Sequence, residues 1–102
     1  MEKLKAAFMF VAPEADSKKH KTTISTPAVE LHVVGVKNYD EACNVAKELV
    51  NQGIAAIELC GGFGNAGVAK VSEAVEYKIP IGVVRFDIHP GLDNKSGDKV
   101  FI

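Results

Sequence analysis

Three polar side chains alternate near the end of an apolar run and could act together on a small molecule. Arg85, Asp87 and His89 are separated by Phe86 and Ile88, so they project from one face if a strand continues through them. An arginine recognises a carboxylate or phosphate, and a histidine held by a carboxylate transfers protons near neutral pH. A structural salt bridge beside an exposed turn histidine is the alternative, and the spacing leaves both open.

A glycine-rich loop after another apolar run is the second candidate. Its residues, with the one that starts the next helical pattern, are Gly61, Gly62, Phe63, Gly64 and Asn65. Unpaired N–H groups at a helix N-terminus attract anions, so we expect this loop, together with Arg85, to bind a small anionic molecule. The spacing is neither the dinucleotide fingerprint nor the P-loop, so the cofactor remains unknown. A tight turn that serves packing alone is the alternative.

Cys60 stands between the apolar run and the glycine loop, where a helix N-terminus can lower a thiol pKa and make a nucleophile. A buried cysteine is also a common core residue. The enzyme hypothesis uses Cys60 as nucleophile, or His89 as an acid or base held by Asp87. Glu58 and His32 interrupt apolar strands and could be structural. No ligand spacing among these residues predicts a metal site.

The apolar patterns predict four strands and two helices that would position these residues. The expected strands are 5–11, 29–36, 54–59 and 81–88. The expected helices are 39–52, with Asn38 as N-cap and Gly53 after its end, and 65–77. The segment 14–26 is polar and irregular, and a short helix is expected near 16–21.

Strands that alternate with helices indicate parallel pairing. We therefore expect residues 1–102 to form a single α/β domain, with a small three-layer open sheet that is mostly parallel and Rossmann-like or flavodoxin-like. The direction of the first strand is left open. Such sheets bind ligands at the carboxyl ends of their strands, so the glycine loop, Asp87 and His89 are expected to meet in one concave pocket.

The composition excludes several classes of function. Of the 102 residues, 47% are hydrophobic and 25% charged, with a net charge of −1, so the basic surface of a nucleic-acid-binding protein is lacking. The basic cluster at 18–21 is interpreted as a solvated loop. No apolar run approaches the roughly 18 residues of a membrane span, and the N-terminus lacks the pattern of a signal peptide. Two cysteines without paired spacing favour a cytoplasmic protein.

A domain of this size buries a limited core and gains stability from a partner. We expect a homo-oligomer, most simply a dimer. The sequence ends on Val100, Phe101 and Ile102, and these apolar residues are expected to be buried against some surface instead of frayed.

Four stretches of sequence carry a resemblance that covers nearly the whole chain. They are 6–16 (AAFMFVAPEAD), 30–36 (ELHVVGV), 58–64 (ELCGGFG) and 82–91 (GVVRFDIHPG). The chain resembles a small bacterial and archaeal family of uncharacterised proteins that carry such motifs. This resemblance supports the α/β fold and implies no activity. Residues 56–61 also resemble, more faintly, the cysteine-dependent aspartate/glutamate racemases, which implies a nucleophilic Cys60, although those enzymes need two such half-sites.

The function favoured by these observations is the binding of a small anionic metabolite at the glycine loop and at the strand end that carries Arg85. An enzyme that uses Cys60 or His89 is one alternative. A structural or interaction module without a small-molecule site is the other.

Overall fold

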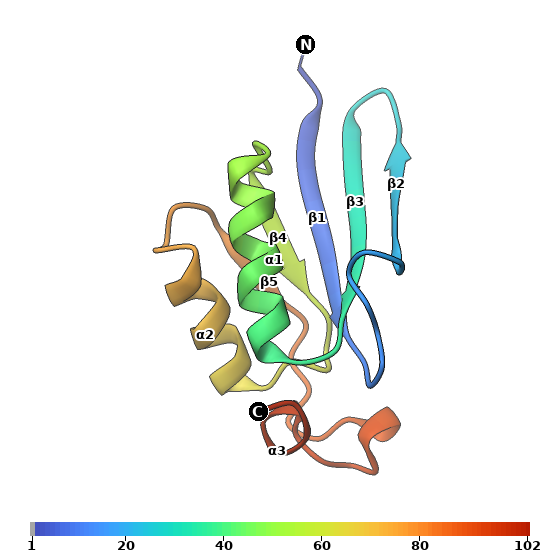
Figure 1. Cartoon of the computed structure of the whole chain (residues 1–102), viewed down its shortest axis with the longest axis vertical. Helices are drawn as coiled ribbons and strands as arrows, with labels where there is room; N and C mark the ends of the chain where they lie inside the picture. Colours follow the sequence, from blue (N-terminus) through green and yellow to red (C-terminus); the bar gives the residue numbers. More distant parts are fainter. Residues whose placement is uncertain (1) are drawn as a thin grey trace.

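The computed structural model describes residues 2–102 and contains a five-stranded sheet with helices packed on it (Figure 1). The strands are β1 (Leu4–Val11), β2 (Lys21–Ser25), β3 (Val29–Val36), β4 (Ala56–Leu59) and β5 (Ile81–Val83). The helices are α1 (Tyr39–Asn51), α2 (Asn65–Ala74) and the short α3 (Gly97–Val100), and a 3-10 turn, η1, covers Pro90–Leu92.

The sheet has the order β2-β3-β1-β4-β5. β1 is parallel to both β3 and β4, and β5 is parallel to β4, so the prediction of a mostly parallel sheet is confirmed. The predicted number of strands is wrong by one, because β2 pairs antiparallel with β3. β2 follows a series of turns where a short helix was expected. Its β-branched residues Thr22, Thr23 and Ile24 favour an extended chain beside a neighbouring strand.

The two main helices lie side by side on the same face of the sheet (Figure 1). The thiol of Cys43 on α1 donates to the carbonyl of Lys70 on α2 across 3.6 Å. Both crossovers, β3–α1–β4 and β4–α2–β5, run in the same direction across the sheet, and right-handed crossovers of one direction place their helices on one face. The expectation of three layers is therefore wrong, and the molecule has two.

The core lies between the sheet and the two helices. Ala7, Met9 and Val11 alternate along β1 and are buried on the helix face. The largest fully buried side chains are Tyr39, Met9, Ile57, Leu59, Val36 and Val71. Helix α1 begins as predicted, since the Asn38 side chain accepts from the Glu41 N–H at 2.9 Å. This core holds the carboxyl ends of β1, β3 and β4 together at the edge of the sheet where the loops gather.

The last strand is shorter than predicted and ends at Val83, before Arg85, Asp87 and His89. Its neighbour β4 ends at Leu59, where the glycine loop begins, so the chain beyond Val83 loses its ladder partner. The three polar residues therefore do not share one face of a strand, and that part of the prediction is wrong.

The C-terminal segment packs against the loops at this edge. Phe101 is only 3% exposed and its ring lies 6.4 Å from that of Tyr39, whereas Val100 is 42% and Ile102 82% exposed. The predicted burial of the end is thus confirmed for Phe101 and wrong for its two neighbours. Over residues 2–102, the structure contains no helix of the length and apolar character needed to cross a membrane.

Candidate functional site

The N-terminus of α2, where an anion was predicted to bind, receives a carboxylate from the same chain. Asp98 of α3 accepts hydrogen bonds from the N–H groups of Ala66 at 2.9 Å and Gly67 at 3.1 Å. The Tyr39 hydroxyl donates to the same carboxylate at 2.8 Å. The chemistry expected of the glycine loop is therefore present, and Asp98 supplies the anion.

Tyr39 joins this carboxylate to the loop. Its hydroxyl accepts from the Gly64 N–H at 3.0 Å while it donates to Asp98. Burial raises the pKa of Tyr39, and the Asp98 carboxylate adds to that rise, so the hydroxyl keeps its proton as a donor. Burial opposes ionisation of Asp98, but the hydrogen bonds from Ala66, Tyr39 and Gly67 together hold its pKa below the usual range. Asp98 is a structural anion at neutral pH.

Two glycines allow the C-terminal segment to approach this closely. A Cβ on Gly97 would lie 1.7 Å from the Gly62 carbonyl oxygen, and one on Gly64 would lie 2.4 Å from the carboxyl carbon of Asp98. Both distances are far below a tolerable contact, so these positions admit no side chain. The glycine loop is consequently shaped to receive the chain's own C-terminal segment.

Of the predicted catalytic residues, Cys60 begins the same loop, and His89 is linked to the loop through Phe86. The Cys60 sulfur is partly buried and accepts from the Gly62 N–H at 3.3 Å. A Cβ on Gly61 would lie 2.2 Å from the ring of Phe86, and that ring packs against His89 with 4.7 Å between centroids. Phe86 thus connects the glycine loop to His89.

Asp87 is engaged with a different partner from the one expected. Its carboxylate forms an exposed ion pair with Arg85, with 2.8 Å between Nη2 and Oδ1. The Nδ1 atom of His89 accepts from the Gly91 N–H at 2.9 Å. These contacts build a turn after β5.

A groove on the helix face is lined by both apolar and polar side chains. Helix α1 crosses over β1 toward β4, so β2 extends beyond the area that the helix covers (Figure 1). The resulting hollow has a volume of about 470 Å³. Its apolar lining includes Val34, Val45 and Leu49, and its polar lining includes Lys18, Lys21, Thr23, His32, Glu48 and Gln52. Ligand sites in proteins combine an apolar surface with a few polar groups in this way.

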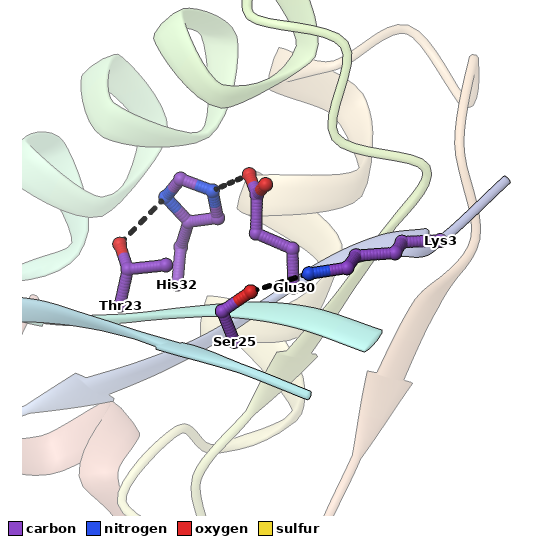
Figure 2. A network of polar contacts seen from close by, with 5 residues as sticks. All are labelled: Lys3, Thr23, Ser25, Glu30 and His32. Atoms are coloured by element: carbon purple, nitrogen blue, oxygen red, sulfur yellow. Dashed lines mark hydrogen bonds and ion pairs between the residues drawn. The ribbon is translucent and has the colours of Figure 1, made fainter. Parts of the chain in front are cut away.

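His32 lies in the groove within a chain of polar contacts (Figure 2). Its Nε2 is 2.7 Å from a carboxylate oxygen of Glu30, and its Nδ1 is 3.4 Å from the hydroxyl of Thr23 on β2. The hydrogen bond with His32 is the main cause that lowers the pKa of Glu30. An ionised carboxylate only accepts, so the Nε2–H of His32 donates to Glu30 and the Thr23 hydroxyl lies beside Nδ1. At the far end of the network, Lys3 donates to Ser25 at 2.6 Å.

The groove also carries basic groups without a partner. Over residues 2–102, neither Lys18 nor Lys21 takes part in an ion pair. The loop that carries Lys18 is held against α1, because the hydroxyl of Ser17 donates to the Glu41 carboxylate at 3.0 Å. In the described part of the chain, no three His, Cys, Asp or Glu side chains gather as a metal site would require. The groove thus carries two basic side chains, Lys18 and Lys21, and one carboxylate, Glu48.

A comparison with known families adds one finding. The chain matches, over residues 4–99, the model of a family described as "Family of unknown function (DUF6506)". The chain belongs to this family. No curated protein and no solved structure is detectably similar to it.

In this member of the family, sequence reasoning missed the groove. Its main signal is His32, a polar residue in an apolar strand, which pairs in register with Thr23 of a strand that was not predicted. The basic cluster at 18–21, interpreted as a solvated loop, contributes Lys18 and Lys21 to the lining. β2 could have been predicted from residues 21–25, in which three side chains on one face alternate with Thr22 and Ile24 on the other. The groove would have followed from that strand.

Proposed function

We propose that this protein binds a small anionic molecule in the groove between α1 and the β2–β3 pair. The observation that carries the proposal is the arrangement of His32 and two unpaired lysines, Lys18 and Lys21, around a cavity of about 470 Å³. That volume falls within the range of small-molecule sites. The anionic group would lie at the lysine end, where two ammonium groups supply the attraction.

The lining also suggests the rest of the ligand. The side chains of Val34, Val45 and Leu49 suit an apolar body. The contact of His32 Nδ1 with the Thr23 hydroxyl is long, at 3.4 Å, so a ligand could replace it with a hydrogen bond whose direction the protonation of the ring decides. A carboxylate or phosphate joined to a short apolar or weakly polar skeleton fits this combination.

Thermal unfolding with a panel of small carboxylates and phosphorylated metabolites tests the proposal. A compound that binds the folded state raises Tm with its concentration. We expect at least one compound of this class to raise Tm, and Lys21→Ala and His32→Gln to weaken that compound by tenfold or more. Lys95→Ala removes an equally exposed charge outside the groove and is the matched control.

The competing site at the strand end is distinguished by Arg85→Ala. If Arg85→Ala abolishes binding while His32→Gln and Lys21→Ala leave it unchanged, the ligand belongs to the glycine loop and its neighbours. If no anionic compound raises Tm, the proposed function is wrong.

A second candidate function is an enzyme with Cys60 as nucleophile. The hydrogen bond from the Gly62 N–H to the sulfur supports it, because such a donor stabilises a thiolate. Both cysteines are free, which also supports a proposed location in the reducing cytoplasm. A rate of Cys60 alkylation that stays high below pH 7 would favour the enzyme, and a rate that follows an ordinary thiol would argue against it.

A further inference from the structure

The face of the sheet opposite the helices is apolar and carries no helix in the described part of the chain (Figure 1). Strand register places nine apolar residues on it, here called the open face: Leu4, Ala6, Phe8, Phe10, Ile24, Val29, Leu31, Val33 and Ala56. Leu4 is 51% and Ile24 53% exposed, and the others are partly exposed. Glu58, which pairs in register with Phe8, is the one carboxylate beside them.

The composition of the central strands indicates that the open face is covered. Parallel strands that are apolar on both faces normally lie between two layers. β1 presents Met9 to the helices and Phe8 to the open face, and β3 presents Val34 and Val33 in the same way. Here only the helix side receives a layer from the chain itself.

The open face is filled at its one glycine on β3, Gly35, by a neighbouring aromatic ring. The ring of Phe10 lies over Gly35 of the neighbouring strand, so closely that a Cβ there would be 2.5 Å from the ring. Aromatic rings laid over a glycine in this way fill the gap that the missing side chain leaves. Two such faces pack about 10 Å apart with their side chains interdigitated.

The dimensions of the sheet set the area that a partner could cover. With about 3.3 Å per residue and about 4.8 Å between strands, β1 and β3 span about 26 Å and the five strands about 24 Å. Because β2, β4 and β5 are shorter, the footprint of the 28 strand residues is about 440 Å² before side-chain relief is added. A standard interface buries about 800 Å² of accessible surface per partner, so the strands supply about half of that area and the side chains that project from them must supply the rest.

We propose that the open face binds the same face of a second copy, with the two sheets packed across a two-fold axis. An apolar face with a single carboxylate offers no charge pattern for an unlike partner, but it is complementary to itself. The sheet edges are poorer candidates, because β5 has only three residues and β2 is polar. The groove lies on the other face, so both copies keep it open and the proposal does not depend on ligand binding.

Sedimentation velocity of the wild type, two variants and one control variant tests the proposal. We expect a wild-type mass of twice 10.9 kDa at micromolar concentration. Ile24→Lys places a charge on the open face from the edge strand β2, and Leu31→Lys places one from the inner strand β3. Each variant should weaken dimerisation by about a hundredfold or more, because the two-fold axis buries one new charge from each copy. Thr23→Lys, on the same strand as Ile24 but pointing to the helix face, is the control and should leave the dimer intact.

Circular dichroism shows whether each variant is folded, and Ile24→Lys, at an exposed edge, tolerates the charge in the monomer. A wild type that remains a monomer at every concentration overturns the proposal. So does a dimer that survives both lysine substitutions in folded proteins, because another surface must then hold it.

Discussion

Removal of the Asp98 carboxylate should be one of the most damaging single changes at the surface of this protein. The side chain accepts three hydrogen bonds, from Ala66, Gly67 and Tyr39, and neutralises the exposed N–H groups of α2. In Asp98→Ala, the buried Tyr39 hydroxyl loses its acceptor and the helix loses a capping carboxylate. A lost cap costs about 0.5–2 kcal/mol, and an orphaned buried donor about 1–3 kcal/mol. We expect a loss of about 2–4 kcal/mol in the free energy of unfolding.

Thermal and urea unfolding measure this loss, which corresponds to a fall in Tm of roughly 10–25 °C for a domain of this size. Asp98→Asn keeps one acceptor oxygen and should lose about half as much. Asp87→Ala is the control, because its carboxylate forms only an exposed ion pair with Arg85 and should cost less than about 1 kcal/mol. If Asp98→Ala unfolds within about 0.5 kcal/mol of the wild type, Asp98 does not cap α2 as argued.

The Asp98 carboxylate should also make the free energy of unfolding depend on pH. Its pKa is lowered in the folded state, so its contribution is fully present above the unfolded value of about 3.9 and is lost as pH falls through the lowered value. The difference in unfolding free energy between the wild type and Asp98→Asn should therefore be constant near neutral pH. It should shrink toward zero in acid. A difference that grows below pH 4 would contradict the assigned direction.

Two further predictions concern the same edge of the sheet. Gly97→Ala should lower the free energy of unfolding by more than about 2 kcal/mol, because its Cβ would collide with the Gly62 carbonyl. Gly82→Ala is the control and should be nearly neutral, because its Cβ meets nothing closer than 3.6 Å. Equal melting temperatures for the two variants would refute the docking of the C-terminal segment. Burial raises the pKa of the Cys43 thiol, whereas the Cys60 sulfur accepts a hydrogen bond from the Gly62 N–H. Iodoacetamide near pH 7 should therefore label Cys60 first, as measured by peptide mapping after brief treatment. Faster labelling of Cys43 would contradict this order.

Much of the fold could be predicted because local patterns decided it. Asn38 and Glu41 stand at capping distance ahead of an apolar stripe, so the start of α1 follows from the sequence. β3 was predicted with its observed bounds because valines recur along residues 29–36 and Lys37 and Asn38 end the apolar pattern. The number of layers depends instead on the direction of the crossovers, and that follows from the strand order, which no single segment encodes.

The site was harder to predict because its contacts join residues that are distant in the sequence. The glycine loop was predicted to bind a small anionic molecule, but the N–H groups that follow it receive Asp98, more than thirty residues further along the chain. No local pattern connects the two. The groove depends on the pairing of Thr23 with His32, so it could be found only after β2 was assigned. Arg85, Asp87 and His89 alternate as in a strand, but β4 ends too early to pair with them.

The position of β1 in the sheet has a consequence for synthesis on the ribosome. β1 is made before the other strands, yet it lies between β3 and β4, so its second edge stays unpaired until Leu59 has been translated. At roughly 5–20 residues per second, that delay is about 2–10 s. The local β2–β3 hairpin can form within microseconds once it emerges and offers β1 its first partner. Until β4 arrives, the nascent chain presents an open apolar strand edge, and we expect it to depend on chaperones during that interval.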